Sequence, residues 1–308
     1  MTVARMHGLH AAKIGSTVLG AIMRRAVRTG SEVRQEATSG EVYARFQALY
    51  AQNPMAEFGT RAIAAALAAC GLTGTALTSG APFLLYSQKQ TEGGTRTSGS
   101  NHRTWTINEG LIYPRRIVCE HQGDATIEYQ VLATYDGTNE PVVPGESAAL
   151  EAPTDAERFT IGPITLYDGS NSHVMDHCKR IEIDLGVQAE TVGADSDIWP
   201  TNCRIIEIQP SITLVGIDSE WWKSTKIPLT GRNIQHSGTS LYLRKRAAGS
   251  TFVANGTAQH VKFTAAGLAV VEGFDASGNA LDEVNVSFPL RFDGTNNPIV
   301  INTASAIT

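Results

Sequence analysis

Residues Tyr135–Val143 read YDGTNEPVV, and residues Phe292–Val300 read FDGTNNPIV. The two stretches start 157 positions apart and share Asp-Gly-Thr-Asn and the Pro that comes two residues after the Asn. Asp and Asn tolerate a left-handed backbone and Gly adopts it freely, so each stretch predicts a tight turn. Self-similarity at about half the length of a 308-residue chain indicates an internal duplication, which decides the fold.

Four further matches keep nearly the same spacing along the chain. They are Gly30 with Gly186, Val42-Tyr43 with Ile198-Trp199 (followed by Pro54 and Pro210), Ser79-Gly80 with Ser237-Gly238, and Gly110-Leu111 with Gly267-Leu268. The spacing drifts only between 156 and 158, as small insertions in surface loops would cause. We therefore expect two diverged copies of one module, residues 1–148 and residues 153–308. The segment Pro144–Glu157, rich in Pro, Ala and acidic residues, predicts an exposed linker between them.

The composition is that of a globular protein. Hydrophobic residues make up 42% and charged residues 18%, so a packed core is expected and disorder is not. The net charge of −5 is unevenly divided: residues 1–150 hold 13 basic and 12 acidic residues, and the remaining 12 basic and 18 acidic residues lie in 151–308. The chain has no basic stripe, which argues against a DNA-binding surface.

Two compositional details bear on the cellular compartment. The four cysteines (Cys70, Cys119, Cys178 and Cys203) form no CxxC pair, which indicates buried free thiols in a reducing environment. The apolar stretch Ile14–Met23 is too short to span a membrane, and no cleavage site follows it. A soluble protein made in the cytoplasm is expected.

Each predicted copy reads as strands with one short helix. Thr126–Leu132 and Glu283–Leu290 alternate apolar and polar residues in the same register, which is typical of half-buried strands. Thr60–Cys70 is Ala-rich, with Thr60 at the predicted N-cap and Gly71 after its end, and predicts a helix whose shorter counterpart is Asp218–Lys223. Further strands are expected at Arg45–Ala51, Phe83–Gln88, Thr104–Ile107, Ile112–Val118, Arg180–Asp184, Arg204–Ile208, Leu241–Lys245, Val261–Thr264 and Leu268–Val271.

No motif predicts catalysis. The best metal-like group is His173, Asp176, His177 and Cys178, but no helical pattern surrounds it, so a surface turn is the favoured interpretation. Asp195, Asp197 and Glu207 are read as solvated carboxylates, and nucleophile elbows, phosphate loops and dinucleotide fingerprints are absent from the sequence. The copies share turns and apolar positions rather than polar groups. We expect no enzyme, no catalytic residue, no metal site and no cofactor.

Three segments are candidates for interactions. The Gly/Ser/Thr-rich stretch Gln88–Arg103 and its counterpart Arg246–Gln259 predict long loops, which are either functional or merely mobile. The terminal segment Pro298–Thr308 is β-prone and nearly uncharged, so it could add a strand to a neighbouring subunit.

The order of segments in copy one resembles a known family. That order is Gly40–Tyr43, Gln52–Pro54, the helix Thr60–Cys70, the loop Gln88–Arg103 and the strand Gly110–Pro114. It is similar to the major tail tube proteins of long-tailed, non-contractile bacteriophages, over most of copy one and more loosely over copy two. The resemblance implies a mainly β fold of two tandem antiparallel β-sandwich or barrel domains, each with a flanking short helix.

The resemblance also implies partners. Single-domain members form six-membered rings that stack around a tape-measure protein and later pass DNA without binding it. A duplicated chain would build a pseudo-six-fold ring from three chains, stacked through its loops and termini, with tail terminator and distal tail proteins at the tube ends. The expected location is the virion tail, assembled in the host cytoplasm without a membrane. The alternatives are a distal tail or tube-capping protein, a receptor- or carbohydrate-binding β-sandwich using Trp221 and Trp222, and last an enzyme.

Overall fold

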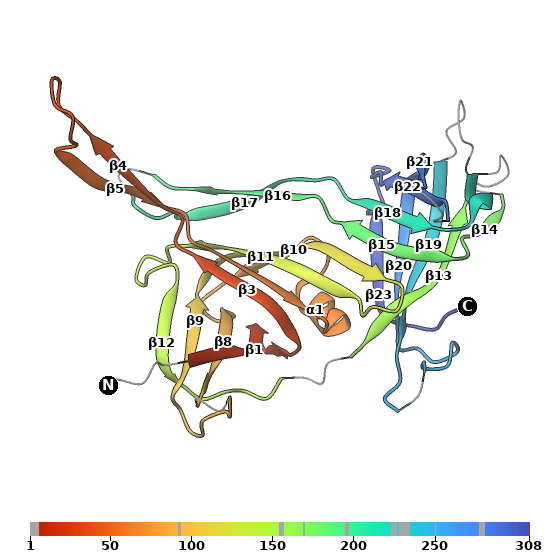
Figure 1. Ribbon diagram of the computed structural model, residues 1–308, viewed down its shortest axis with the longest axis horizontal. Coiled ribbons are helices and arrows are strands. Elements are labelled where there is room, and N and C mark those ends of the chain that lie inside the picture. Colours follow the sequence, from red (N-terminus) through yellow and green to blue (C-terminus); the bar gives the residue numbers. More distant parts are fainter. Residues whose placement is uncertain are drawn as a thin grey trace.

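The protein is mainly β, as predicted (Figure 1). The computed structural model describes residues 6–91, 94–153, 157–168, 170–194, 197–222, 227, 235–249, 251–276 and 281–308. Over these residues the chain forms strands β1–β23, one α-helix and one 3-10 helix. None of the helices in the described residues is long and apolar enough to cross a membrane.

The elements of the first half lie between residues 6 and 148. They are β1 (Met6–Ile14), β2 (Thr17–Leu19), β3 (Ile22–Arg28), β4 (Ser31–Glu36), β5 (Phe46–Gln52), β6 (Met55–Thr60), α1 (Ile63–Cys70), β7 (Thr75–Leu77), β8 (Phe83–Gln90), β9 (His102–Ile107), β10 (Glu109–Glu120), β11 (Thr126–Thr134) and β12 (Val143–Ala148).

The elements of the second half lie between residues 159 and 305. They are β13 (Phe159–Tyr167), β14 (Ser172–Val174), β15 (Cys178–Asp184), β16 (Val187–Val192), β17 (Asn202–Ile208), β18 (Ser211–Gly216), the 3-10 helix η1 (Ser219–Trp222), β19 (Gln235–Lys245), β20 (His260–Leu268), β21 (Val270–Asp275), β22 (Glu283–Pro289) and β23 (Ile299–Ser305).

The two halves have the same strand order. One outer sheet runs β12-β9-β8-β1-β2 and the other β23-β20-β19-β13-β14. A central sheet runs β3-β6-β11-β10-β15-β18-β22-β21, in which β3-β6-β11-β10 is followed by its counterpart β15-β18-β22-β21. The hairpin β4–β5 has its counterpart in the hairpin β16–β17. The duplication itself stays a prediction, and we use this correspondence of strand order below to define equivalent positions.

Irregularities in the ladders also correspond. The pair β10–β11 shifts register between Pro114 and Arg116, and the pair β21–β22 shifts between Val271 and Gly273, at positions 157 apart. The pair β4–β5 shifts at Glu32/Val33, and β16–β17 shifts at Gln188/Ala189, at positions 156 apart. Since a bulge re-aims the side chains of its strand, corresponding bulges indicate that equivalent side chains face equivalent directions.

The repeated turns are held by the same hydrogen bonds. Asp136 accepts the backbone N–H groups of Thr138 (2.8 Å) and Asn139 (2.6 Å) on Oδ1. Asp293 accepts those of Thr295 (2.8 Å) and Asn296 (2.6 Å) in the same way. Three hydrogen bonds, the third from the Asn side chain to Oδ2, lower the pKa of Asp293 to about 2.

One buried core runs through both halves. Phe58 stacks on Phe83 (5.2 Å between ring centroids) and on Tyr129 (5.1 Å), which joins the central sheet to the first outer sheet. Helix α1 buries Ile63, Ala66, Leu67 and Cys70 in this core. The helix therefore adds an apolar face to the space between the sheets, as its Ala/Leu-rich sequence predicts.

The start of the helix differs from the prediction. Thr60 is the last residue of β6, and α1 begins at Ile63 with Ala62 at the N-cap. The Thr60 hydroxyl donates to the carbonyl of Gly20 (2.8 Å) and accepts the N–H of Ala62 (3.0 Å), so it closes the strand-to-helix turn instead of capping the helix. The end is as predicted, with Gly71 at φ +68° following Cys70.

The predicted linker is wrong in its first part. Pro144–Ala148 belongs to β12, which pairs with β9 at the edge of the outer sheet, where a proline without an N–H group is tolerated. The terminal segment Pro298–Thr308 supplies β23, which pairs with β20 of its own chain rather than lying free. The loop predicted at Gln88–Arg103 is shorter, because β8 extends to Gln90 and β9 begins at His102. The strand predicted at Leu268–Val271 is divided at Ala269, between β20 and β21.

Candidate assembly interface

The two halves are joined by one antiparallel strand pair, β10–β15. Its register places Ile117 opposite Ile183 and Cys119 opposite Ile181, and all four side chains are buried. Burial raises the pKa of the Cys119 thiol to about 12, so it behaves as a small apolar side chain here. Backbone hydrogen bonding and apolar packing thus join the central strands of both halves, with β7 paired to β10, into one nine-stranded sheet.

Charged residues of opposite sign line the face of this junction that points away from the buried core. Arg116 of β10 lies 3.6 Å from Glu182 of β15, and Arg180 of β15 lies 3.8 Å from Glu120 of β10. Hydrogen bonding to Glu128 on the neighbouring β11 raises the pKa of Arg116. Such exposed pairs contribute little stability each, but they select which strand fits beside which.

Hairpin β16–β17 reaches from the second half over the central sheet of the first half, as Figure 1 shows. It lays Val187, Ala189, Cys203 and Ile205 on a buried cluster formed by Leu111, Tyr113 and Leu132. The neck of the hairpin is fixed by Gly186 (φ +57°), where an added Cβ would lie 2.0 Å from the carbonyl oxygen of Gln209. Gly30 makes the same neck for hairpin β4–β5, with φ +59° and a Cβ position 2.3 Å from the carbonyl oxygen of Asn53.

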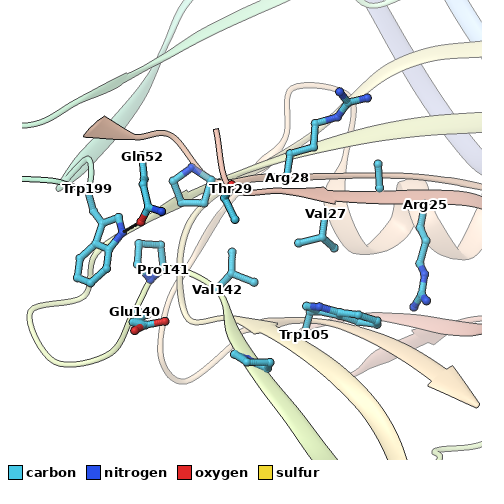
Figure 2. Close-up of a pocket in the computed structure, with 13 residues that line it drawn as sticks. Arg25, Val27, Arg28, Thr29, Gln52, Trp105, Glu140, Pro141, Val142 and Trp199 are labelled. Carbon is cyan, nitrogen blue, oxygen red and sulfur yellow. Dashed lines mark hydrogen bonds between the residues drawn. The ribbon is translucent and has the colours of Figure 1, made fainter. Parts of the chain in front are cut away.

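The turn of hairpin β16–β17 docks onto the first half. The Gln52 N–H donates to the Ile198 carbonyl (2.8 Å), and the Trp199 indole Nε1–H donates to Gln52 Oε1 (2.7 Å). The Tyr135 N–H donates to the Pro200 carbonyl (2.8 Å), and the rings of Tyr135 and Trp199 lie 5.4 Å apart. Figure 2 shows Trp199 at one side of a pocket with Gln52, Pro141 and Val142.

The two outermost strands of the central sheet are β3 and β21. They are the counterparts of β15 and β10, the two strands that pair with each other inside the chain. The edge strand β3 carries the exposed Arg24 and Arg28, whereas β21 carries Glu272 and Asp275; the half-buried Arg25 instead donates to Ser87 Oγ and lies over the Trp105 ring. The exposed edges of the central sheet therefore have opposite charge. Their strands correspond to β15 and β10, which already pair with each other inside the chain.

Hairpin β4–β5 projects from the body of the molecule at the upper left of Figure 1. Most of its residues are exposed, including Val33, Phe46 and Leu49. At its turn Val42 and Tyr43 are 91% and 84% exposed. Apolar side chains on a projecting, uncovered arm are a recognised mark of an interaction site.

The metal-like group of the sequence does not form a site. The His173 Nε2–H donates one hydrogen bond to Asp168 Oδ2 (2.9 Å), and Cys178 Sγ–H donates to backbone carbonyls of Arg180 (3.3 Å) and Val215 (3.5 Å). His177 lies at φ +59° in the turn before β15, and the backbone carbonyl of Asp176 accepts the indole N–H of Trp221 (2.9 Å). Among the described residues no three His, Cys, Asp or Glu side chains gather as metal ligands.

Other residues singled out in the sequence make local hydrogen bonds or are buried. Asp197 accepts the Ala194 N–H (3.4 Å), and Glu207 accepts a hydrogen bond from Gln209 (2.5 Å), while Asp195 lies outside the described residues. Trp221 is fully buried, so it is no surface platform for a sugar ring. Cys70 and Cys119 are buried free thiols as predicted, but Cys178 and Cys203 are only half-buried.

The sequence pointed to the repeated dipeptides Val42-Tyr43 and Ile198-Trp199 without revealing their role. Apolar and aromatic residues in a polar hairpin turn were the available signal, because a turn has no core of its own to fill. The sequence of neither β10 nor β15 by itself indicated that these two strands pair. The chain matches no known protein family, and no curated protein is significantly similar to it.

Proposed function

We propose that this chain is a structural subunit that polymerises through its sheet edges into closed rings, and that stacked rings form the tube of a bacteriophage tail. The observation that carries the proposal is that β3 and β21, the open edges of the central sheet, are the counterparts of β15 and β10. An edge strand is a template for pairing with another chain. In the proposed ring β21 of one chain pairs with β3 of the next, so every module has a neighbour on each side.

The in-chain junction gives the register of the pairing between chains. Transferring Arg116↔Asp184 and Ile117↔Ile183 to the equivalent positions places Gly273 opposite Arg28 and Phe274 opposite Val27. Asp275 then lies opposite Ala26, with Arg24 and Arg28 on its two diagonals. Diagonal neighbours in an antiparallel pair are within reach of long side chains, so Asp275 can form an ion pair with either arginine.

Charge also disfavours the incorrect pairings. Strand β10 presents Arg115 and Arg116, so its pairing with the arginine-bearing edge of β3 brings like charges together. Strand β15 presents Glu182 and Asp184, so its pairing with the acidic edge of β21 is disfavoured for the same reason. First and second modules are thereby expected to alternate around the ring.

The resemblance to tail tube proteins supports six modules per ring, and therefore three chains. Both outer sheets pack on the core side of the central sheet, so closure with the outer sheets outside turns the other face toward the channel. That face carries a ladder of alternating charges formed by Arg24, Glu57, Glu128, Arg115, Arg116, Glu182, Arg180 and Glu120. By the same resemblance a tape-measure protein fills the channel during assembly, terminator and distal tail proteins close its ends, and DNA passes later without being held.

Electron microscopy and native mass spectrometry of the purified chain test the proposal. We expect rings or striated tubes, and a ring mass of three chains. Chains that remain monomeric at high concentration would overturn the proposed polymerisation. Closed rings of six chains would retain the structural role and overturn the stoichiometry. Single rings that never stack would favour a tube-end protein of the same tail over the tube subunit.

A further inference from the structure

The pocket beside Trp199 has a counterpart in the second half. The first pocket is lined by Gln52, Pro54, Glu140, Pro141 and Val142. The second pocket is lined by the residues at the equivalent positions, which are Ile208, Pro210, Asn297, Pro298 and Ile299. The turn of hairpin β16–β17 contributes Trp199 to the first pocket, whereas the described residues lining the second include none from the turn of either hairpin.

The segment that matches this second pocket is the turn of hairpin β4–β5. Val42 and Tyr43 occupy the positions of Ile198 and Trp199, and both are among the most exposed apolar residues of the chain. Hairpin β4–β5 projects at the end of the molecule opposite to β23, so its turn does not reach the second pocket of its own chain (Figure 1). The residues that would fill the site therefore belong to a second copy.

We infer that Tyr43 of one chain docks into the pocket formed by Ile208, Pro210, Phe292 and Pro298 of a second copy of this chain. Phe292 occupies the position of Tyr135, which lies 5.4 Å from Trp199 inside the chain, and it is 57% exposed. The inference rests on the proposed ring, because the neighbour whose β21 pairs with β3 is the one whose pocket hairpin β4–β5 then faces.

The backbone contacts of the docked turn follow from the in-chain site. There the N–H groups of Gln52 and Tyr135 donate to carbonyls of the turn, at Ile198 and Pro200. At the equivalent positions the N–H groups of Ile208 and Phe292 would donate to the carbonyls of Val42 and Ala44 of the neighbour. The side-chain hydrogen bond from Trp199 to Gln52 has no equivalent, because Ile208 stands in place of Gln52. The second site is accordingly more apolar than the first.

The arm of the hairpin matches the surface beneath it as well. Val33 and Leu49 are the counterparts of Ala189 and Ile205, which cover the Leu111 cluster inside the chain. At the equivalent position of the second half, Val270 stands in place of Tyr113 and is exposed. The strands of hairpin β4–β5, and not its turn alone, would thus meet an exposed apolar residue at the equivalent position of the neighbouring copy.

Disulfide trapping tests the inference. In the double variant Tyr43→Cys/Phe292→Cys, oxidation of the assembled protein should link chains into covalent multimers on a non-reducing gel. The matched control is Tyr50→Cys/Phe292→Cys, because Tyr50 lies on the same hairpin and its counterpart Ile206 stays exposed at the in-chain junction. The variant Tyr135→Cys/Trp199→Cys calibrates the method, since those side chains meet within one chain.

Efficient linkage of Tyr43→Cys/Phe292→Cys, with little in the Tyr50 control, supports the inference. Equal linkage in both pairs, or assembled rings without linkage while the calibration pair closes, would overturn the docking and leave the ring in place. Chains that never assemble would overturn both. As a second measurement, Tyr43→Ala should raise the protein concentration needed for assembly about tenfold or more, as removal of a buried aromatic anchor does, and Tyr50→Ala should change it less than about twofold.

Discussion

Ile117 and Ile183 lie directly opposite each other at the junction of β10 and β15, and both are buried. They come from different halves of the chain, and their strands turn two separate sheets into one. The pair therefore belongs both to the buried core and to the contact between the two halves.

Ile183→Ala should lower the free energy of unfolding by about 2–5 kcal/mol, because it leaves a cavity in a packed junction. Ile206→Ala removes the same atoms from an exposed position on β17 and should change stability by less than about 0.5 kcal/mol. Urea unfolding at a concentration below assembly measures both. Equal effects of the two variants would contradict the packed junction.

Gly110→Ala should destabilise the chain by at least about 2 kcal/mol. Gly110 has φ +142°, and an added Cβ would lie 1.9 Å from the carbonyl oxygen of Leu132, so β10 and β11 would have to separate. Gly80→Ala is the control, because its Cβ would meet no atom within 4 Å. Thermal unfolding followed by circular dichroism compares them, and a tolerated Gly110→Ala would show that the β10–β11 ladder is misplaced.

Acid should weaken the turn at Asp293. The folded-state pKa of Asp293 is about 2, below the value near 4 of an unfolded chain. The stability contributed by this carboxylate is therefore fully present above pH 4 and is lost as the pH falls toward 2.

Asp293→Asn keeps an oxygen acceptor and removes the titration. The stability difference between wild type and Asp293→Asn should consequently shrink between pH 5 and pH 2, as measured by urea unfolding at each pH. An Asp293 carboxyl that titrates near pH 4 in an NMR experiment would contradict the hydrogen-bonded turn.

Charge reversal at one open edge should block assembly, and reversal at both should restore it. In the proposed register Asp275 of one chain lies diagonal to Arg28 of the next. Arg28→Asp and Asp275→Arg should each raise the concentration required for assembly, and the double variant Arg28→Asp/Asp275→Arg should recover most of the loss. Light scattering during dilution measures this concentration. A double variant that assembles no better than the single variants would contradict the register.

Much of the fold could be predicted from the sequence. The alternation in Thr126–Leu132 and Glu283–Leu290 located β11 and β22, because one face of each strand is buried and the other is not. Thr60 was misassigned since a threonine before an Ala-rich run fits an N-cap and a strand end equally well. The segment after Val143 was misassigned because Pro and Gly suggest a loop, while an edge strand also accepts them.

The candidate interface could be predicted only in part. The match between Val42-Tyr43 and Ile198-Trp199 was visible, but a match does not tell where a hairpin turn docks. The pairing of β10 with β15 joins residues far apart in the sequence, such as Cys119 and Ile181, which are 62 positions apart, and no local pattern specifies such a partner. Only the three-dimensional structure shows that the open edges β3 and β21 occupy positions in the strand order equivalent to those of β15 and β10.

The presence of β10 and β15 in one chain also bears on the kinetics of assembly. In a ring of six separate modules every junction forms by collision and depends on protein concentration. When two modules share one chain, the junction within the chain forms at the effective concentration set by its connection, which for short tethers is in the millimolar range. In the proposed ring of three chains, half of the junctions would be complete before chains meet, so fewer diffusional encounters would be needed and partial rings would have fewer ways to come apart.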